Sequence, residues 1–490
     1  MKRFYGRLLI LLILFNFTLI DGKGAYAQDT LQHPEYATLL SNYIQFPSEH
    51  LQEKEAAEFL MEFCKQKGFF TEVLIDEDTA FNFAASIYPL DSNKPNIIFF
   101  SHVDVVPPGD TSAWKYPPYS GAIVDGRIWG RGAIDCKGMT VAQLYAMINI
   151  KEWAETQELP FNVTLLPVTG EETDGYTGAK PISERFLERL NPYVMLGEGG
   201  GGMLGLLRSE PDKPVFGVST IEKTKLTLNL SMNLKASGHG SVPPGQYAGK
   251  EMIFALQRLL KEEPELKFSP INTKGLKKMG KFEKGVPGFV QRNFTFFCFK
   301  PLVKKEIRRD PQLLSFFSNT ITLTDIHVPD PEHNQVIQEI RATLDCRLMP
   351  GTNPNAFIRG IKRSLKDPRI EVSTLYEIEA VPQTDAPELF NHLSSAITET
   401  YPDALVVEMI FPATTDNNFF RAKGIPVFGV FPALVEQDAL NSIHAVNEYI
   451  EIQSIEDAID VYTDFAENLI FEEKKSRKRL FRFRKKRNDN

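Results

Sequence analysis

Residues 96–106 read NIIFFSHVDVV, an apolar run rich in Ile, Phe and Val that contains two titratable side chains near its end, His102 and Asp104. A short run of β-branched and aromatic residues predicts a buried strand. Three later runs have the same character: NVTLLPVT at 162–169, YVMLGE at 193–198 and PVFGVFP at 426–432. Residues 141–155 and 452–471 carry instead the apolar spacing of helices. This alternation predicts an α/β domain with a mostly parallel central sheet flanked by helices.

The pattern changes after residue 222. Residues 223–234 read KTKLTLNLSMNL and alternate apolar with polar side chains, as a half-buried strand does. The remaining elements expected in this region are a helix at 251–260, a strand at 339–350, a helix at 355–365 and a strand at 369–378. We therefore predict a smaller α+β domain at 222–381, inserted between the two parts of the first domain, 34–221 and 382–471.

One segment of the inserted region, about 265–320, is additional to these expected helices and strands. It is basic and rich in Phe. Two interpretations fit its composition: an apolar cap over a site, or a segment that packs on itself and its neighbours. Phe side chains are more often buried than exposed, which favours packing.

The N-terminus has the organisation of an export signal. Lys2, Arg3 and Arg7 precede an apolar run at 8–20, and Ala25-Tyr26-Ala27 then gives the small-x-small pattern of a cleavage site. The alternative, a transmembrane anchor, needs roughly 20 apolar residues, and this run is shorter. We predict a signal peptide at 1–27 and a mature chain in the periplasm or outside the cell.

The chain carries a formal net charge of -8, although its end, 472–490, contains the basic stretch KKSRKRLFRFRKKR. The rest of the chain is therefore more acidic than the total suggests, and we expect no nucleic-acid partner. The tail is predicted to be a disordered, solvated end. The alternative is contact with an anionic membrane surface through its interleaved Leu and Phe.

The four cysteines, Cys64, Cys136, Cys298 and Cys346, are too few for a fold held by disulfides, and no pair can be assigned.

Acidic and imidazole side chains lie at or just after the predicted strands and in Gly-rich loops. They are His102 and Asp104 in SHVDVVP, Asp135 in GRGAIDCKG, Glu171 and Glu172 in VTGEETDG, Glu198 in MLGEGGGG and His444 in SIHAVNEYI. Each motif alone is weak, because an Asp in a Gly-rich loop or a single His is usually structural. Open α/β sheets, however, place their sites at the strand ends. The ordered set therefore indicates a hydrolase with two metal ions, which needs mixed nitrogen and oxygen ligands and a separate base.

Two of these motifs suggest how tasks are divided. Asp104, two residues after His102, is suited to accept the second ring N–H of that imidazole and so to fix its tautomer. The neighbours Glu171 and Glu172 can point to different tasks, one binding metal and one holding the proton of the attacking water.

The series as a whole resembles the dinuclear zinc family that includes aminoacylases, glutamate carboxypeptidase, succinyl-diaminopimelate desuccinylase and carboxypeptidase S. The likeness extends from about Pro34 to Phe471. Residues 101–138, SHVDVVPPGDTSAWKYPPYSGAIVDGRIWGRGAIDCKG, are similar to the branch of carboxypeptidase S and N-acyl amino acid hydrolases. The resemblance implies an α/β catalytic domain with an inserted α+β domain for lid and dimerisation functions.

The resemblance also implies roles for the acidic and imidazole residues. One metal ion would be held by His102, Asp135 and Glu198, and the other by Asp135, Glu172 and His444. Glu171 would be the general base, and Asp104 would orient His102. Zinc is the first expectation for both ions, with manganese or cobalt as alternatives. Cys136 is a departure, since relatives commonly have a second acid there.

Further residues match the family's substrate contacts. His239, in SGHGSVPP, would polarise the scissile carbonyl or hold its oxyanion, often across a dimer interface. Asn334 and Arg347 would meet the substrate carbonyl and carboxylate, because the Arg fork binds a carboxylate at two points. Thr415 and, more weakly, Asp416 in ATTDNNFF would line the pocket.

These features predict a secreted metal-dependent hydrolase that cleaves an amide next to a free carboxylate, in a small peptide or an N-acyl amino acid. A dipeptidase or aminopeptidase of the same family is the first alternative. A catalytically silent binding module is a distant one, because the base and the ligand set are intact.

Overall fold

The computed structural model describes residues 33–77, 80–173, 175–235, 238–294, 296, 299–329 and 334–471. The expected signal peptide at 1–27, the basic tail at 472–490 and Cys298 lie outside the described residues. Cys64, Cys136 and Cys346 are buried free thiols. Within the described part of the chain, no helix combines the length and the apolar content that a membrane crossing requires.

Eight strands form the larger sheet, in the order β1-β2-β6-β3-β7-β14-β8-β13. Their bounds are β1 Phe70–Glu77, β2 Ala80–Ser86, β6 Asn162–Val168, β3 Asn96–His102, β7 Pro192–Met203, β14 Val427–Leu434, β8 Val215–Glu222 and β13 Leu405–Phe411. The pairs β6–β3, β3–β7, β7–β14 and β8–β13 are parallel. The β1–β2 and β2–β6 pairs are antiparallel, at one edge. The predicted mostly parallel sheet is confirmed.

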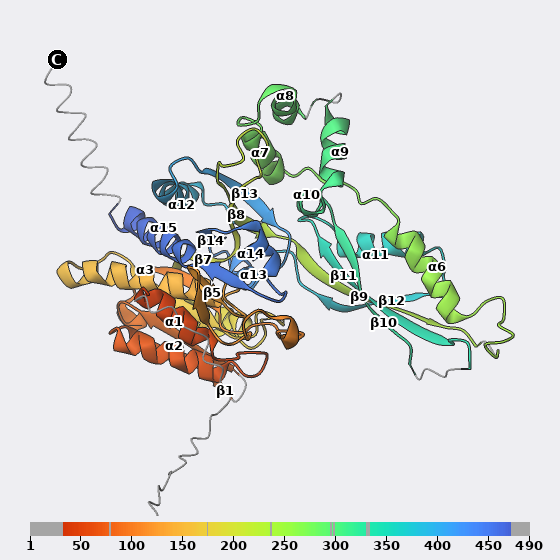
Figure 1. The fold of residues 1–490 in the computed structure, drawn as a ribbon, viewed down its shortest axis with the longest axis horizontal. Helices are drawn as coiled ribbons and strands as arrows, with labels where there is room; N and C mark the ends of the chain where they lie inside the picture. The colour runs from red at the N-terminus through yellow and green to blue at the C-terminus, as the bar shows by residue number, and fades with distance from the viewer. Residues whose placement is uncertain are drawn as a thin grey trace, which may run out of the picture.

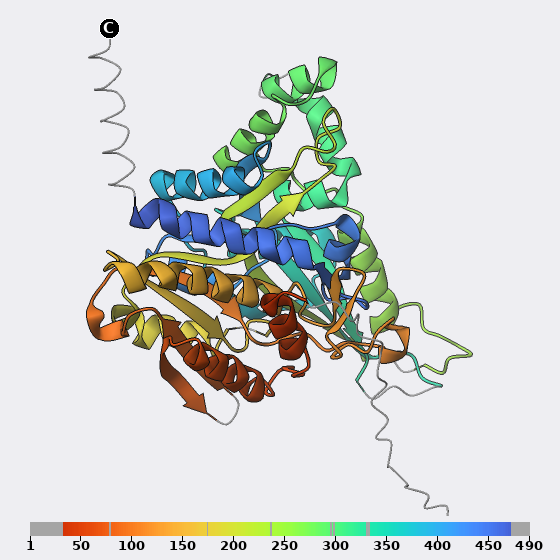
Figure 2. The same cartoon turned by 60° about the vertical axis from the view of Figure 1, so that its left-hand side comes forward.

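Helices cover both faces of this sheet (Figures 1 and 2). One layer holds α1 Glu35–Ile44, α2 Lys54–Gln66, α3 Lys137–Thr156, α12 Pro387–Thr400 and α15 Ile452–Ile470; the other holds α4 Ala179–Arg185, α5 Leu187–Leu190 and α13 Asn417–Arg421. Ile97 and Phe99 of β3 pack in the first layer, and Ile98 and Phe100 in the second. The run NIIFF is apolar throughout because both of its faces are buried.

A separate small sheet has three strands, in the order β15-β5-β4. It consists of β4 Ala122–Val124, β5 Arg127–Trp129 and β15 Tyr449–Glu451. Short elements nearby are η1 Leu90–Ser92, η2 Thr111–Ala113 and α14 Gln437–Ser442. The β15–β5 pairing joins the segment after His444 to the segment before Asp135, although more than 300 residues separate them in the sequence.

A second, fully antiparallel sheet has the order β10-β11-β9-β12. It consists of β9 Thr224–Asn233, β10 Thr320–His327, β11 Glu339–Leu348 and β12 Glu371–Glu377, and one face carries α6 Ala248–Leu260 and α11 Pro354–Leu365. Leu226, Leu228 and Leu230 of β9 pack under these helices, whereas the residues between them face the other way. The alternation found in the sequence reflects this one-sided burial. The chain enters the sheet directly after β8 and reaches α12 after β12.

The described part of the segment between α6 and β10 forms four short helices. They are α7 Pro270–Met279, α8 Gly285–Asn293, α9 Lys300–Arg309 and α10 Pro311–Phe317. Leu266, Phe294, Ile307 and Phe317 belong to a separate apolar cluster within this segment. Met279 packs beside Leu405 of the edge strand β13, which ties the helices to the larger sheet. Figures 1 and 2 both show α8 and α9 projecting at one end of the molecule.

Candidate metal centre and substrate pocket

Asp135 lies between two imidazoles. Its Oδ1 is 3.0 Å from Nε2 of His102, and its Oδ2 is 3.1 Å from Nε2 of His444. Burial opposes ionisation of Asp135, but hydrogen bonds from the two imidazoles hold its pKa below the ordinary value. A carboxylate that presents one oxygen to each of two nitrogen ligands is arranged to bridge two cations.

Two groups of ligands meet at this carboxylate. Nε2 of His102 lies 3.6 Å from Oε2 of Glu198, and Nε2 of His444 lies 3.2 Å from Oε1 of Glu172. Ligand atoms that lie within 4.8 Å of one another are found in the sets His102–Glu171–Glu198, Asp135–Glu172–His444 and His102–Asp135–Cys136. The structure thus brings together all five residues for which the sequence predicted metal binding.

The donor set fits divalent cations. Oε2 of Glu198 is buried and has no hydrogen-bond partner among the described residues. Nδ1 of His102 lies 2.9 Å from the backbone oxygen of Asp104, and an N–H donated there leaves Nε2 free as a ligand. A buried carboxylate without a partner is costly, and a bound cation removes that cost.

The Asp104 carboxylate has a task that was not predicted, in addition to lying beside His102. It lies 3.6 Å from Nδ1 of His102, whereas the Asp104 backbone oxygen is at hydrogen-bond distance. The side chain instead accepts the backbone N–H groups of Gly170 at 3.0 Å, Glu171 at 3.2 Å and Glu172 at 2.9 Å. Asp104 therefore fixes the turn after β6 that carries both acids.

The location of Glu198 also differs from the expected strand end. Strand β7 continues through the four glycines to Met203 and pairs with β14 and β8. A Cβ at Gly200 would lie 1.9 Å from the backbone oxygen of Gly217. The glycines thus allow close strand pairing beyond Glu198 where larger residues would not fit.

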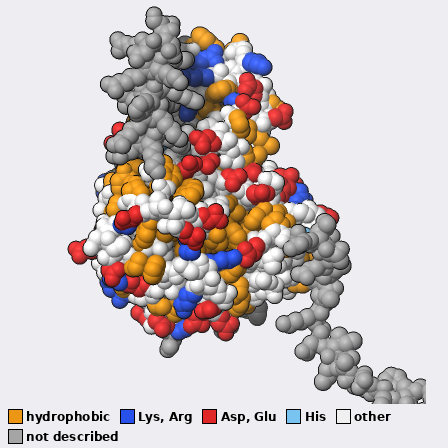
Figure 3. Space-filling view, turned by 90° about the vertical axis from the view of Figure 1, so that its left-hand side faces the viewer, with side chains coloured by type: hydrophobic (Ala, Val, Ile, Leu, Met, Phe, Trp, Pro, Cys, Tyr) orange, Lys and Arg blue, Asp and Glu red, His pale blue; other side chains and the backbone are white. Residues whose placement is uncertain are grey.

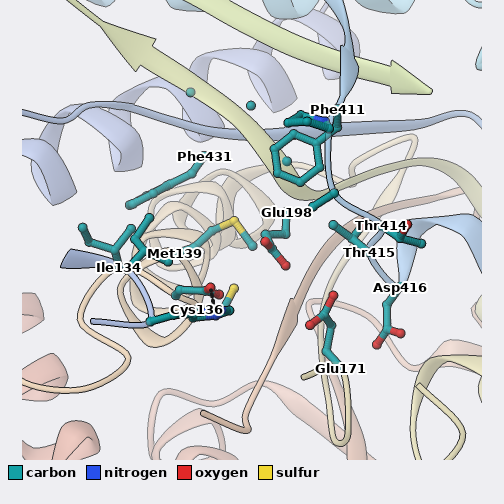
Figure 4. A pocket seen from close by; sticks show the side chains of 18 of the residues that line it. Ile134, Cys136, Met139, Glu171, Glu198, Phe411, Thr414, Thr415, Asp416 and Phe431 are labelled. Atoms are coloured by element: carbon teal, nitrogen blue, oxygen red, sulfur yellow. Dashed lines mark ion pairs between the residues drawn. The ribbon is translucent and has the colours of Figure 1, made fainter. Parts of the chain in front are cut away.

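The Glu171 carboxylate points into the pocket, toward the space below Glu198 (Figure 4). Burial, and then the negative charge of Glu198, raise the pKa of Glu171 well above the ordinary value. Bound cations oppose this rise by favouring the ionised carboxylate. A carboxyl whose pKa is raised above its ordinary value is suited to accept and release a proton.

Glu448 is a functional residue that the sequence did not reveal. Its buried carboxylate accepts the backbone N–H groups of Gly132, Ile134 and Asp135 at 3.0, 2.9 and 3.2 Å, and it pairs with Arg131 at 2.7 Å. These contacts fix the loop that carries the bridging carboxylate. An acid four residues after His444 was the available signal, but nothing local distinguished it from a surface acid.

A second network of buried hydrogen bonds and ion pairs is centred on Glu222. Glu222 pairs with Arg421 and accepts the backbone N–H and the hydroxyl of Thr415, both at 2.8 Å. Nδ2 of Asn417 donates to the backbone oxygen of Glu198 at 2.6 Å. Thr415 lines the cavity as predicted, but its hydroxyl proton is donated to Glu222.

The cavity beside the metal centre has a volume of about 510 Å³. Glu171, Glu172 and Glu198 line the cavity, whereas much of the wall is apolar. Figure 4 shows Glu171 and Glu198 among the lining residues. The apolar wall includes Ile134, Met139, Phe316, Met409, Phe411 and Phe431. Phe316 comes from α10, so the Phe-rich segment both packs on itself and contributes to the cavity wall.

Two basic side chains from the smaller sheet also line the cavity. Arg347 and Lys225 are directly opposite on β11 and β9. The Arg347 guanidinium forms a two-point pair with Asp345, at 2.8 and 3.2 Å. Lys225 Nζ lies 5.4 Å from the ring centroid of Tyr376. Both side chains line the cavity.

His239 and Asn334 are not part of this lining. His239 is exposed in the loop after β9, and its Nδ1 lies 2.7 Å from the Ser241 hydroxyl oxygen. The backbone of His239 bridges that of Gln335, so His239 and Asn334 lie near each other but away from the cavity of the same chain.

Comparisons with known proteins agree with this geometry. The model of peptidase family M20/M25/M40 matches residues 98–468. A probable carboxypeptidase S-like protein of Dictyostelium discoideum is 27% identical over 384 residues, which cover 77% of this chain and 72% of the relative. The N-fatty-acyl-amino acid synthase/hydrolase PM20D1 of Mus musculus is 25% identical over 390 residues, covering 78% and 76%. An M20 family metallo-carboxypeptidase from Sulfolobus solfataricus has a TM-score of 0.67 at 20% identity, covering 88% of this chain and 98% of the other.

Proposed function

The chain belongs to peptidase family M20/M25/M40, and from that premise we propose that it hydrolyses the amide bond of N-acyl amino acids whose acyl group is apolar. Membership makes it a metal-dependent hydrolase of the carboxypeptidase or acyl amino acid hydrolase type. The observation that carries the finer proposal is the cavity of about 510 Å³, which joins an acidic metal centre to an apolar wall and two cations. An apolar acyl chain, a scissile amide and a free carboxylate match these three regions.

The residues of the centre would hold two divalent cations, for which we propose zinc. The first proposed ligand set is His102 with Asp135 and Glu198, which lie 3.0 and 3.6 Å from its Nε2. The second is Asp135, Glu172 and His444, whose ligand atoms lie close together. When bound, the cations supply Lewis-acid polarisation of the carbonyl and lower the pKa of the attacking water.

Proton transfer falls to Glu171. Its carboxylate faces the cavity. Its backbone N–H donates a hydrogen bond to the Asp104 carboxylate at 3.2 Å. Glu171 takes the proton of the attacking water and passes it to the amine nitrogen that leaves. Arg347 and Lys225 bind the substrate carboxylate and so place the amide at the acidic end.

We also propose a homodimer, in which His239 of one subunit completes the cavity of its partner. The support is the exposure of His239 outside its own cavity, together with the family likeness of its motif. The test mixes two inactive variants, Glu171→Gln and His239→Ala, under conditions that exchange subunits. In a mixed dimer the His239→Ala chain receives His239 from its partner, so amine release should return. Continued inactivity of an exchanged mixture contradicts the dimer.

Export and a membrane contact of the tail remain proposals that rest on the sequence. Residues 2–27 motivate cleavage before Gln28, and the basic stretch at 474–487 motivates contact with anionic lipid. N-terminal sequencing of the chain recovered from its producing cells tests the first, since an uncleaved Met1 would contradict it.

The proposed activity is tested by amine release from matched N-long-chain-acyl, N-acetyl and free dipeptide substrates, with and without a chelator. Cleavage of N-acyl substrates that is lost on chelation is the expected result. Cleavage of free dipeptides alone supports the alternative dipeptidase instead. The absence of any cleavage by a chain with two bound zinc ions overturns the proposed reaction.

A further inference from the structure

The outer end of the α7–α10 segment exposes several large apolar side chains. Val286 and Phe289 on α8, Phe296 in the following turn and Leu302 on α9 are 74%, 50%, 61% and 53% exposed. Single exposed apolar residues are common, but a group within one helix–turn–helix unit marks an interaction surface. We refer to these four residues as the apolar tip.

The two helices account for this exposure. On α8, Val290 is buried, as is Phe294 just after the helix, whereas Val286 and Phe289, three residues apart, share an outward side. On α9, Val303 and Ile307 are buried and Leu302 is not. The rings of Phe289 and Phe299 meet edge-on at 5.6 Å, which links α8 to the start of α9. The inward sides are thus used for packing, and the tip is left to solvent.

Basic side chains accompany the apolar tip. Residues 265–318 contain twelve Lys and Arg but four Asp and Glu, in a chain whose net charge is -8. Lys281, Lys284 and Lys305 are exposed, and within the described part of the chain none of them has an ion-pair partner. At the top of Figure 3, the level at which Figure 1 draws α8 and α9, blue basic and orange apolar side chains occur together, with some red acidic side chains among them.

We propose that the apolar tip and these lysines dock the protein on the surface of an anionic lipid bilayer. Apolar side chains at a projecting end can enter the boundary between headgroups and acyl chains. Lysines without an ion-pair partner beside them contact anionic headgroups, and each contributes favourably to the free energy of binding at the surface. The positive charge of the segment in an acidic chain gives the charge complementarity that selects anionic lipid.

The docking surface is connected to the cavity. Helix α10 follows α9 directly and contributes Phe316 to the cavity wall. Docking at α8 and α9 would therefore hold the apolar wall near a lipid phase, in which substrates with apolar acyl chains concentrate. This last step rests on the proposed function, but lipid binding itself does not.

The test is co-sedimentation of the full chain with vesicles of phosphatidylcholine alone and of phosphatidylcholine mixed with phosphatidylglycerol. Two double variants probe the surface: Phe289→Ser with Phe296→Ser, and Lys284→Glu with Lys305→Glu. The matched control is Phe70→Ser with Leu375→Ser, whose side chains are 53% and 59% exposed elsewhere. Every variant keeps the residues outside the described ranges, so their contribution to binding is constant.

We expect binding to the anionic vesicles that exceeds binding to the neutral ones and weakens with salt. Each tip variant should reduce that binding about tenfold or more, while the control leaves it unchanged. The proposal is overturned if the tip variants bind the vesicles as well as the unchanged chain does. It is also overturned if the control variant loses as much vesicle binding as the tip variants. Amine release from soluble substrates separates the two proposals: a chain that releases none but loses vesicle binding in the tip variants refutes the reaction and not the docking surface.

Discussion

The carboxylate of Glu448 accepts a hydrogen bond from the backbone N–H of Asp135, at 3.2 Å. The same carboxylate accepts two neighbouring backbone N–H groups and pairs with the buried Arg131. Glu448 lies on the segment that also carries His444, and it therefore fixes the loop that carries Asp135. Strand pairing between β15 and β5 brings the two segments together.

Replacing Glu448 by Gln should weaken metal binding about 10- to 100-fold, because one of the groups that orient a ligand is altered. It should also lower the free energy of unfolding by about 3 kcal/mol or more, since Arg131 stays buried without its counter-charge. Metal titration against a competing chelator and denaturant unfolding measure the two effects. Glu451→Gln is the control, because Glu451 pairs with Arg127 at a more exposed site. Equal metal affinity in both variants would contradict the proposal that Glu448 positions Asp135.

Replacing Glu171 by Gln should lower kcat by roughly 10²- to 10⁴-fold, the range of a lost general base. Metal content, measured by elemental analysis, should stay at the level of the unchanged chain, because the proposed ligand sets do not include Glu171. Undiminished turnover at unchanged metal content would refute the proton-transfer assignment.

Metal binding should release protons. Hydrogen bonds to Asp135 and then to Glu172 raise the pKa of His444 to about 10, so the imidazole of the metal-free chain is protonated at pH 7. A cation needs the neutral ring, and the apparent affinity should therefore rise with pH up to about 10. Calorimetry in buffers of different ionisation enthalpy counts the protons. The His444→Gln variant should release about one proton fewer, and a binding enthalpy that is independent of the buffer contradicts the prediction.

Removing the Arg347 fork should raise KM for substrates with a free carboxylate by about 10- to 100-fold, which corresponds to the loss of charge-assisted hydrogen bonds. Arg347→Lys keeps the charge but loses the two-point geometry, so it should recover part of the affinity. The methyl ester of the same substrate is the control, because it lacks the carboxylate. A similar rise in KM for acid and ester would show that Arg347 acts through the fold of β11.

The sequence predicted that five residues bind metal, because each lies in a short motif beside a strand or in a Gly-rich loop. Their convergence follows from the parallel sheet and from the pairing of β15 with β5. The apolar run 96–106 and the alternating run 223–234 were equally informative, because full burial and one-sided burial leave different periodicities. The two sheets follow directly from that contrast.

Contacts to backbone groups could not be read from the sequence. Asp104 and Glu448 accept N–H groups that belong to turns far away in the chain, and such acceptors leave no residue pattern. Glu198 was expected at a strand end, because four glycines usually mark a turn, but here they permit close strand pairing. His239 is in the loop after β9 and Arg347 is on β11, and only the three-dimensional structure shows that Arg347 lines the cavity whereas His239 does not.

The apolar wall should set the preference for the acyl group, and Phe316 on α10 is its most specific test. Phe316→Ala removes an aromatic ring from the wall, and KM for an N-long-chain-acyl amino acid should rise by about 10- to 100-fold. KM for the N-acetyl analogue should hardly change, because its acyl group is too short to contact much of the wall. Phe289→Ala is the matched control, since it lies in the same segment but is exposed and outside the cavity. If Phe316→Ala raises KM equally for both substrates, the wall supports the fold of the site and does not select the acyl chain.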